Sequence, residues 1–343
     1  MKNLIKATAF SILLGLSSCE TEKFTETTNE VEVIDSNISE QDSKAVSSNN
    51  WFYIINKESG KSLSVEVSNN DVVTWDYWGG DSQRWYVESV GSGYYKLTSG
   101  HGNNLTLDIA GVNRNNGGDA IVYPYVGQHN EHFKFEDAGD GYYAIVPRHS
   151  KKVLDYFSET GDVVQWDNFG SDKQKWMLVP AGGEGKLSWR WTTSNVPGEA
   201  RARIEASMNA AVARYNRWGN WPARTITVEY NSSVHTADGN PNGNIRFGAK
   251  ESSQGERTAL HEIAHTMGVG FWEPSLINNA RNFTGPKALA VYRSFEGKNA
   301  NITTDNNHFW QYGLNFNREG SEVNKERHAQ IVWAMRVDGL ITY

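Results

Sequence analysis

The sequence predicts two folded domains, an all-β domain followed by an α+β domain. The first expectation rests on residues 51–180, which contain three repeats of about 45 residues with short alternating strands, Gly/Asn/Asp turns and no helical period. The second rests on residues 186–343, where strand patterns and amphipathic helix patterns follow one another. A chain of 343 residues is long enough to fold both domains.

The first 49 residues are expected to lie outside both domains. A positively charged start, a short apolar run and small residues precede Cys19, the chain's single cysteine, so residues 1–19 are typical of a secretory signal. Residues 16–19, Leu-Ser-Ser-Cys, resemble the lipobox of bacterial lipoproteins, which implies lipidation of Cys19 and anchoring in the bacterial cell envelope, at the outer membrane or cell surface. An ordinary secretory signal is the alternative. Residues 20–49 are polar and aperiodic and predict a disordered tether.

The composition narrows the classes of partner. The net charge of −7 and the pI near 5.8 argue against a nucleic-acid partner, which would favour a basic face. One cysteine excludes an intramolecular disulfide. Thirteen Trp and 15 Tyr suit either a β-rich core or stacking on sugars. We expect a monomer.

The three repeats end in Q-x-W or a variant of it, with closing aromatic residues at Trp85, Phe133 and Trp176. With the L-x-[DE] element early in each repeat, residues 50–180 resemble the ricin-type β-trefoil lectin family. The resemblance implies three lobes, each with a shallow carbohydrate pocket. In that family an acid early in the repeat accepts sugar hydroxyls, an aromatic residue stacks on the sugar, and a late polar residue completes the contact.

The family's contact positions can be carried over repeat by repeat. They fall on Glu66, Trp75 and Gln83 in repeat 1, on Asp108, Tyr123 and Asn130 with Glu131 in repeat 2, and on Asp155, Trp166 and Gln174 in repeat 3. Repeat 1 has Glu where Asp is usual, and repeat 2 lacks the closing Gln and Trp. We therefore expect repeat 3 to hold the best pocket. A trefoil whose pockets no longer bind is the alternative.

A Gly-rich stretch at 181–186 predicts a flexible linker to the second domain, residues 186–343. The order of elements after it resembles that of zincin metallopeptidases. In that family an edge strand pairs with the substrate backbone, which points to 244–248 here. The expected elements are strands at 187–191, 225–230 and 244–248 and helices at 197–215, 253–267 and 324–335.

The motif His261-Glu262-x-x-His265 lies in the second of these helices. Residues four apart lie on one face of a helix, so the two imidazoles can bind one metal ion while Glu262 stays free as a base. Ser253 and Glu256 predict a capping box, and Gly268 and Gly270 predict the helix end. The alternative is a helix that carries two histidines by chance.

A third ligand must come from elsewhere in the chain. The motif matches the start of the metzincin consensus, but Phe271 occupies the position of that family's third ligand and cannot bind zinc. His308 is the favoured ligand because it lies in a polar loop beside Phe309 and Trp310. The alternatives that remain open are Glu273, His328, Asp305 and Glu322.

These resemblances imply a zinc endopeptidase that a lectin module directs to glycosylated protein substrates. Glu262 would act as the general base, and Tyr312 is a candidate oxyanion donor. One alternative is a glycan-binding lipoprotein whose zincin half is inactive. A glycosidase would need two carboxylates beside a sugar cleft, and the sequence marks no such pair.

Overall fold

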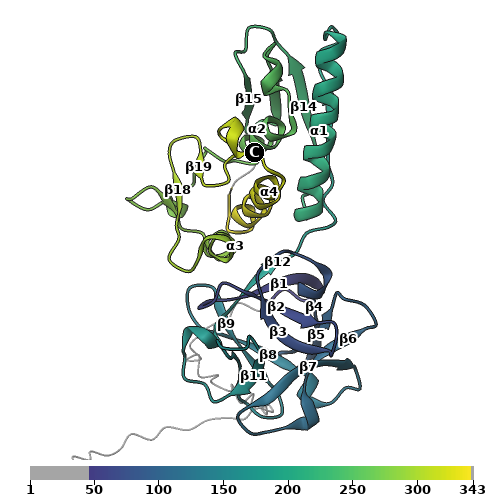
Figure 1. Cartoon of the computed structure of the whole chain (residues 1–343), viewed down its shortest axis with the longest axis vertical. Coiled ribbons are helices and arrows are strands. Elements are labelled where there is room, and N and C mark those ends of the chain that lie inside the picture. The colour runs from purple at the N-terminus through teal and green to yellow at the C-terminus, as the bar shows by residue number, and fades with distance from the viewer. Residues whose placement is uncertain (1–45, 341–343) are drawn as a thin grey trace, which may run out of the picture. The chain divides into compact units, whose positions relative to one another are not determined.

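The computed structural model describes residues 46–340 (Figure 1). The expected signal with Cys19, and the expected tether up to residue 45, lie outside the described residues. Within the described part of the chain, no helix is both long and apolar enough to cross a membrane.

The first domain consists of antiparallel strands that repeat the same pattern three times. Hairpins β2–β3, β6–β7 and β10–β11 each occupy the same place in one repeat, and β1 pairs with both β12 and β4 to join the two ends of the domain. The strands are β1 (Asn50–Asn56), β2 (Ser62–Glu66), β3 (Asp71–Trp75), β4 (Arg84–Gly91), β5 (Tyr94–Ser99), β6 (Leu105–Ile109), β7 (Gly118–Pro124), β8 (Phe133–Asp137), β9 (Tyr142–Pro147), β10 (Val153–Tyr156), β11 (Val163–Trp166) and β12 (Trp176–Pro180).

The closing aromatic residues of the repeats form the centre of this domain. Trp85, Phe133 and Trp176 are fully buried in one hydrophobic cluster. Each indole N–H donates to a backbone carbonyl, Trp85 to Leu63 at 3.0 Å and Trp176 to Leu154 at 3.2 Å. These residues are therefore part of the domain's core, and the two tryptophans tie the end of their repeats to the early strand.

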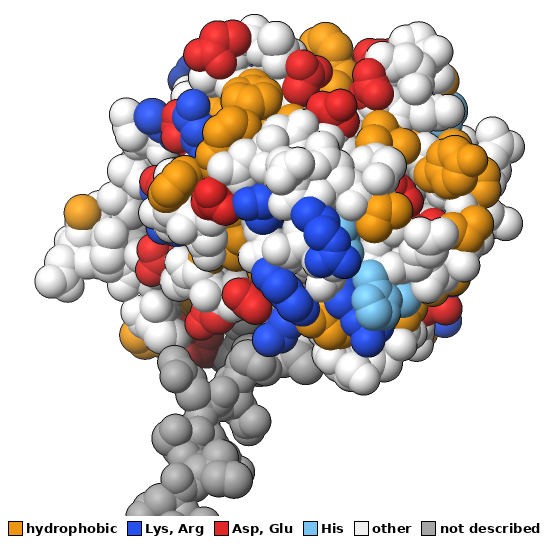
Figure 2. All heavy atoms as spheres, turned by 90° about the horizontal axis from the view of Figure 1, so that it is seen from below, with side chains coloured by type: hydrophobic (Ala, Val, Ile, Leu, Met, Phe, Trp, Pro, Cys, Tyr) orange, Lys and Arg blue, Asp and Glu red, His pale blue; other side chains and the backbone are white. Residues whose placement is uncertain are grey.

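One face of the molecule carries a group of Lys and Arg side chains beside His side chains, with Asp and Glu side chains around it (Figure 2). The two signs of charge are mixed on this face.

The 181–186 stretch is not the flexible linker that its glycines suggested. Ala181 is fully buried, and a Cβ on Gly182 would lie 2.1 Å from the carbonyl carbon of Trp218. A Cβ on Gly185 would lie 2.5 Å from the side chain of Asn216. Glycine is required here for close packing against helix α1 rather than for freedom of the backbone.

The second domain combines a four-stranded sheet with four helices and a small three-stranded sheet. The larger sheet has the order β13-β14-β16-β15, in which only β15 runs antiparallel to its neighbour. Its elements are β13 (Leu187–Trp191), α1 (Gly198–Trp218), β14 (Arg224–Tyr230), β15 (Ala237–Asn240), β16 (Asn244–Phe247), α2 (Glu256–Thr266), β17 (Asn282–Phe283), α3 (Pro286–Glu296), β18 (Ile302–Thr304), β19 (Phe309–Trp310) and α4 (Glu322–Val337).

The expectation that 244–248 forms the edge strand is wrong. β16 lies between β14 and β15, and the edge is β15, in a stretch that looked like turns. Residues 237–240, Ala-Asp-Gly-Asn, have low strand propensity, so nothing in their composition indicated a strand. Their pairing with β16 overrides that propensity.

Helix α2 begins two residues later than the predicted capping box implied, because that box would make Ser253 the N-cap. Its N-cap is Gly255, no side chain caps it, and Ser253 belongs to a preceding 3₁₀ turn, η5 (Glu251–Ser253). Glu256 instead forms ion pairs with Arg214 on α1 and Lys325 on α4. The expected end of the helix is confirmed.

Gly268 and Gly270 follow the helix with φ of 102° and 87°, a conformation that favours glycine.

Helix α2 is held from both sides. Its apolar face is buried in the core of the domain, and the guanidinium of Arg214 on α1 also pairs with Glu322 and Glu326 of α4. These contacts fix the position of the histidine-bearing face.

Candidate metal centre

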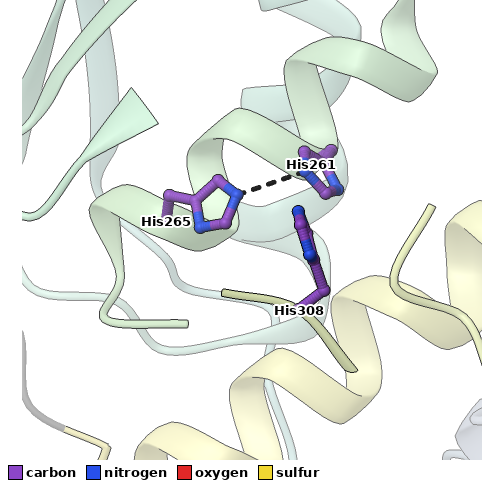
Figure 3. A group of neighbouring side chains, drawn as sticks. All are labelled: His261, His265 and His308. Atoms are coloured by element: carbon purple, nitrogen blue, oxygen red, sulfur yellow. Dashed lines mark hydrogen bonds between the residues drawn. The ribbon is translucent and has the colours of Figure 1, made fainter. Parts of the chain in front are cut away.

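Three histidines from two separate segments converge in the second domain. His261 and His265 lie one turn apart on α2, and His308 comes from the turn between β18 and β19 (Figure 3). One ring nitrogen from each lies within 4.8 Å of the other two. The Nε2 atoms of His261 and His265 are 3.2 Å apart. Tetrahedral zinc with bonds of about 2.0–2.1 Å to imidazole would hold two such nitrogens about 3.3 Å apart, so these residues fit zinc.

Hydrogen bonds on the far side of each ring set the tautomer. The Nδ1–H of His261 donates to the Gly313 carbonyl at 2.8 Å, and that of His265 donates to the Val269 carbonyl at 2.9 Å. Both Nε2 atoms are therefore left with a lone pair that points into the site. Burial lowers the pKa of His265 and lowers that of His261 well below its usual range, which keeps both rings neutral, as metal binding requires.

His308 is oriented by an acidic partner. Its Nδ1 lies 3.3 Å from Oδ2 of Asp305, whose other oxygen accepts the backbone N–H of His308 at 2.6 Å. Although burial raises the pKa of Asp305, hydrogen bonds from the backbone of Asn307 and His308 lower it overall, which favours the carboxylate. In Figure 3 the outer nitrogen of His308 points toward the other two rings. Asp305, considered above as a ligand, instead orients one.

Glu262 is buried beside the histidines. Its side chain belongs to the same cavity, and the residue is only 5% exposed. Burial and, to a smaller extent, nearby Asp238 raise the pKa of Glu262 to about 8, against the opposing effects of the Arg257 guanidinium and the backbone hydrogen bond from Gly239. A cation held by the histidines would also lower the pKa of Glu262. A carboxyl group with a raised pKa beside three metal-ligand side chains is suited to accept and return a proton.

The cavity around the site has a volume of about 610 Å³ and is lined by residues from three parts of the domain. Residues 236–239, which include most of β15, lie on its wall, and Phe271 is 45% exposed there. Tyr312 does not line this cavity. It is buried, and its hydroxyl donates to Glu296, so its candidacy as an oxyanion donor is wrong.

Two of the other ligand candidates, His328 and Glu322, are engaged elsewhere. His328 is fully buried in α4, and its two ring nitrogens are hydrogen-bonded to Tyr312 and Leu260 carbonyls and the Tyr215 hydroxyl. It is therefore a core residue. Glu322 pairs with Arg214 and Lys325.

The contact positions that the lectin resemblance implies can be located in the first domain. Gln174 donates to Asp155 at 2.9 Å, and Asn130 donates to Asp108 at 2.9 Å. The corresponding Gln83 donates not to Glu66 but to Ser64, at 3.0 Å.

The assignment of Glu66 to the acidic position is therefore wrong. Trp85 and Trp176 bond to Leu63 and Leu154, and the residue after each leucine is Ser64 and Asp155 respectively. The Leu-Asp pairs of repeats 2 and 3 could have identified Ser64. Repeat 1 consequently lacks a carboxylate at this position.

Repeat 2 has a cavity at its contact positions. Asp108, Tyr123 and Asn130 line a volume of about 180 Å³, with Tyr123 54% exposed. Burial raises the pKa of Asp108 to about 6, against the effect of the hydrogen bond from Asn130. In repeat 3, Trp166 is partly exposed and Oδ1 of Asp155 has no hydrogen-bond partner among the described residues. In repeat 2 an aromatic residue and a carboxyl group therefore line one cavity, and in repeat 3 they lie on paired strands, with Asp155 opposite Val164 and Trp166 opposite Val153.

Comparison with known families decides the nature of the first domain. Residues 50–176 match the family described as ricin-type beta-trefoil lectin domain. These residues form a ricin-type β-trefoil lectin domain. The match ends before the second domain, which contains helices and sheets to which no family is assigned.

Several solved structures resemble the lectin domain. The designed three-fold symmetric protein ThreeFoil is 36% identical over 38% of this chain and 97% of its own, with a TM-score of 0.36. The exo-beta-1,3-galactanase 1,3Gal43A from Clostridium thermocellum is 34% identical over 39% of this chain and 31% of its own, with a TM-score of 0.37. A Polyporus squamosus lectin is 16% identical over 76% of this chain and 80% of its own, also with a TM-score of 0.37. Comparison with curated proteins gave no match.

Proposed function

We propose that the chain is a zinc-dependent endopeptidase whose lectin domain brings it to glycosylated protein substrates. The observation that carries this proposal is the convergence of His261, His265 and His308 beside the buried carboxyl of Glu262. Three neutral imidazoles and one carboxylate that is free of the metal are the set that zinc hydrolases use.

Zinc bound by the three histidines would polarise the scissile carbonyl and activate water as the nucleophile. The chain's own contribution begins with Glu262, which takes a proton from the attacking water and returns it to the leaving amine. Because Glu262 lies on the same helix as two of the histidines, its carboxyl group is held at a fixed distance from them.

The edge strand β15 is suited to bind the substrate backbone. Among the described residues it pairs with no strand other than β16, although the backbone N–H of Gly239 donates to the Glu262 carboxyl group, so a peptide could add to the remaining groups on its outer side. Three of its residues, Ala237, Asp238 and Gly239, lie on the wall of the cavity. A peptide that extends the sheet at β15 would therefore run past the three histidines.

The lectin domain supplies the second part of the proposal. A shallow pocket with an exposed aromatic residue and a carboxyl group is suited to a sugar, since the ring stacks and the hydroxyls donate. The domain would raise the local concentration of glycosylated substrate at the cavity. We further propose that Cys19 is lipidated and anchors the protein in the cell envelope. Loss of membrane fractionation in Cys19→Ala would test this.

Metal content and hydrolysis test the enzymatic proposal together. The purified protein should contain one equivalent of zinc, cleave a casein-type substrate, and lose cleavage on treatment with a chelator. Re-addition of zinc should restore it. A protein that binds glycans but holds no zinc would instead be a glycan-binding protein with an inactive second domain.

A further inference from the structure

An arginine lines the cavity of the proposed metal centre one turn before the first histidine. Arg257 lies on α2 four residues before His261, on the same face of the helix. Its guanidinium is partly buried and donates to the Leu314 carbonyl at 2.5 Å and to Thr258 Oγ1 at 2.7 Å. Both acceptors are neutral.

Arg257 differs in this respect from two other partly buried arginines of the domain, Arg214 and Arg327, but resembles Arg224, which also donates to carbonyl oxygens. Arg214 pairs with three carboxylates, and Arg327 pairs with Glu296. In contrast, no carboxylate among residues 46–340 lies within salt-bridge distance of the Arg257 guanidinium. A guanidinium stays charged at neutral pH, so Arg257 keeps a positive charge at the wall of the cavity that no direct ion pair neutralises, although Glu262 and Glu319 lie near enough to favour its charged form.

The other charges of the cavity do not neutralise it. Asp238 is held by Arg246 through two hydrogen bonds of 2.9 and 2.6 Å, so its charge is already balanced. Glu262 is the proposed general base and lines the same cavity, and it forms no salt bridge with Arg257. Lys250 adds a second cation at the cavity wall and is exposed. The space beside the histidines therefore offers a positive charge to whatever enters it.

We propose that Arg257 binds a carboxylate of the substrate and so makes the enzyme select acidic peptides. This inference rests on the proposed peptidase function. The planar guanidinium matches a carboxylate in shape, and partial burial strengthens the attraction relative to a pair in open water. The carboxylate is that of an Asp or Glu side chain near the cleaved bond or that of the peptide's own C-terminus.

Matched peptides separate these two sources. A quenched fluorescent peptide library with Asp or Glu scanned through the positions on both sides of the cleaved bond is compared with its Asn or Gln counterpart. Each peptide is prepared with a free C-terminus and with an amidated one. Preference for Asp or Glu regardless of the terminus identifies a side chain, and preference for the free acid identifies the C-terminus.

Arg257→Gln tests the residue itself, with Arg257→Lys as the charge-conserving variant. We expect wild type to favour the acidic peptide at least tenfold in kcat/KM, Arg257→Gln to bring this ratio close to one, and Arg257→Lys to retain part of it. Arg190→Gln, on an exposed arginine of β13, is the matched control and should keep the wild-type ratio. The inference would be overturned if Arg257→Gln favoured the acidic peptide as strongly as the wild type does. It would also be overturned if the variant lost kcat/KM equally on the acidic and the amide peptide.

A binding measurement makes the test independent of turnover and of folding defects. In the Glu262→Gln background, titration calorimetry should show tighter binding of the acidic peptide than of its amide counterpart, and Arg257→Gln should remove the difference. Equal binding of the two peptides to the parent variant contradicts the inference alone. Lack of any hydrolysis by zinc-loaded wild type contradicts the proposed function instead, and the two failures are therefore distinguishable.

Discussion

The rings of His308 and His261 lie almost parallel, with centroids 5.5 Å apart and planes 27° apart. The two residues belong to the β18–β19 turn and to helix α2, which are distant in sequence. The third ring, His265, stands at 86° to His261 and 67° to His308. This arrangement brings one nitrogen of each ring to a common point, so a change at His308 should affect the metal more than the fold.

His308→Ala should therefore purify largely free of zinc while remaining folded. Removal of one of three protein ligands leaves a two-ligand site that binds zinc weakly. Asp305→Ala, which removes only the partner of the ring, should lower zinc affinity about 10–100-fold. Plasma emission spectrometry and competition with a chromophoric chelator measure both effects. His328→Gln is the control variant, since His328 does not reach the site. A full complement of zinc in His308→Ala would show that His308 is not a zinc ligand.

Glu262→Gln should retain zinc and the melting temperature of the wild type but lose hydrolysis by several orders of magnitude. Glutamine has the same shape but cannot accept the proton from water. Progress curves on a casein-type substrate with metal content measured on the same sample check this. Wild-type turnover by the zinc-loaded variant would show that another residue is the base.

Repeats 2 and 3 of the lectin domain, each of which has a carboxyl group and an aromatic residue at the contact positions, should bind sugar independently. Asp155→Ala and Trp166→Ala should abolish binding at repeat 3, and Asp108→Ala and Tyr123→Ala should abolish it at repeat 2. Peptide hydrolysis should be unchanged in all four. Glycan arrays followed by calorimetry on the best ligand would give the number of sites. If neither Asp155→Ala nor Asp108→Ala changed the glycan-array profile, sugar would bind elsewhere on the domain.

Asp338 should make the domain less stable as the pH rises from about 4 to 7. Its buried carboxyl accepts the backbone N–H groups of Lys287 and Ala288 at 3.1 and 2.8 Å, and burial raises its pKa from 3.8 to about 6. The folded state therefore holds this proton more tightly than the unfolded state does. The resulting stability is full below about pH 4 and is lost as pH rises through about 6, with a maximum of about 3 kcal/mol.

Asp338→Asn, which resembles the protonated acid, should lack this pH dependence. Urea denaturation at pH 4 and pH 7 should show the variant gaining stability relative to wild type as the pH rises. A constant difference between the two proteins at both pH values would contradict the assignment of the raised pKa to Asp338.

The sequence predicted those features that depend on local patterns. The closing aromatic residues, the helix that bears His261 and His265, and its end at Gly268 all follow from spacing and residue type, and the structure confirms them. His308 was predicted by elimination and by its polar, aromatic surroundings, and the structure brings it to the other two histidines.

Features set by distant pairing were not predictable in the same way. The edge position of β15 depends on its pairing with β16 rather than on its own residues. The start of α2 at Glu256 goes with ion pairs from Glu256 to Arg214 and Lys325, which come from other helices. Ser64, in contrast, could have been identified from the Leu-Asp pairs of repeats 2 and 3, and was missed because repeat 1 has no carboxylate at that position.

The free edge at β15 also bears on self-association. An open strand edge can pair with the same edge of a second molecule and start aggregation. β15 has only four residues, and Asp238 with Arg246 places a charge pair beside it. A short, charged edge disfavours extended pairing between two rigid sheets, whereas a single flexible peptide can still add to it. The same strand can therefore remain open to a passing chain without making the protein prone to precipitate.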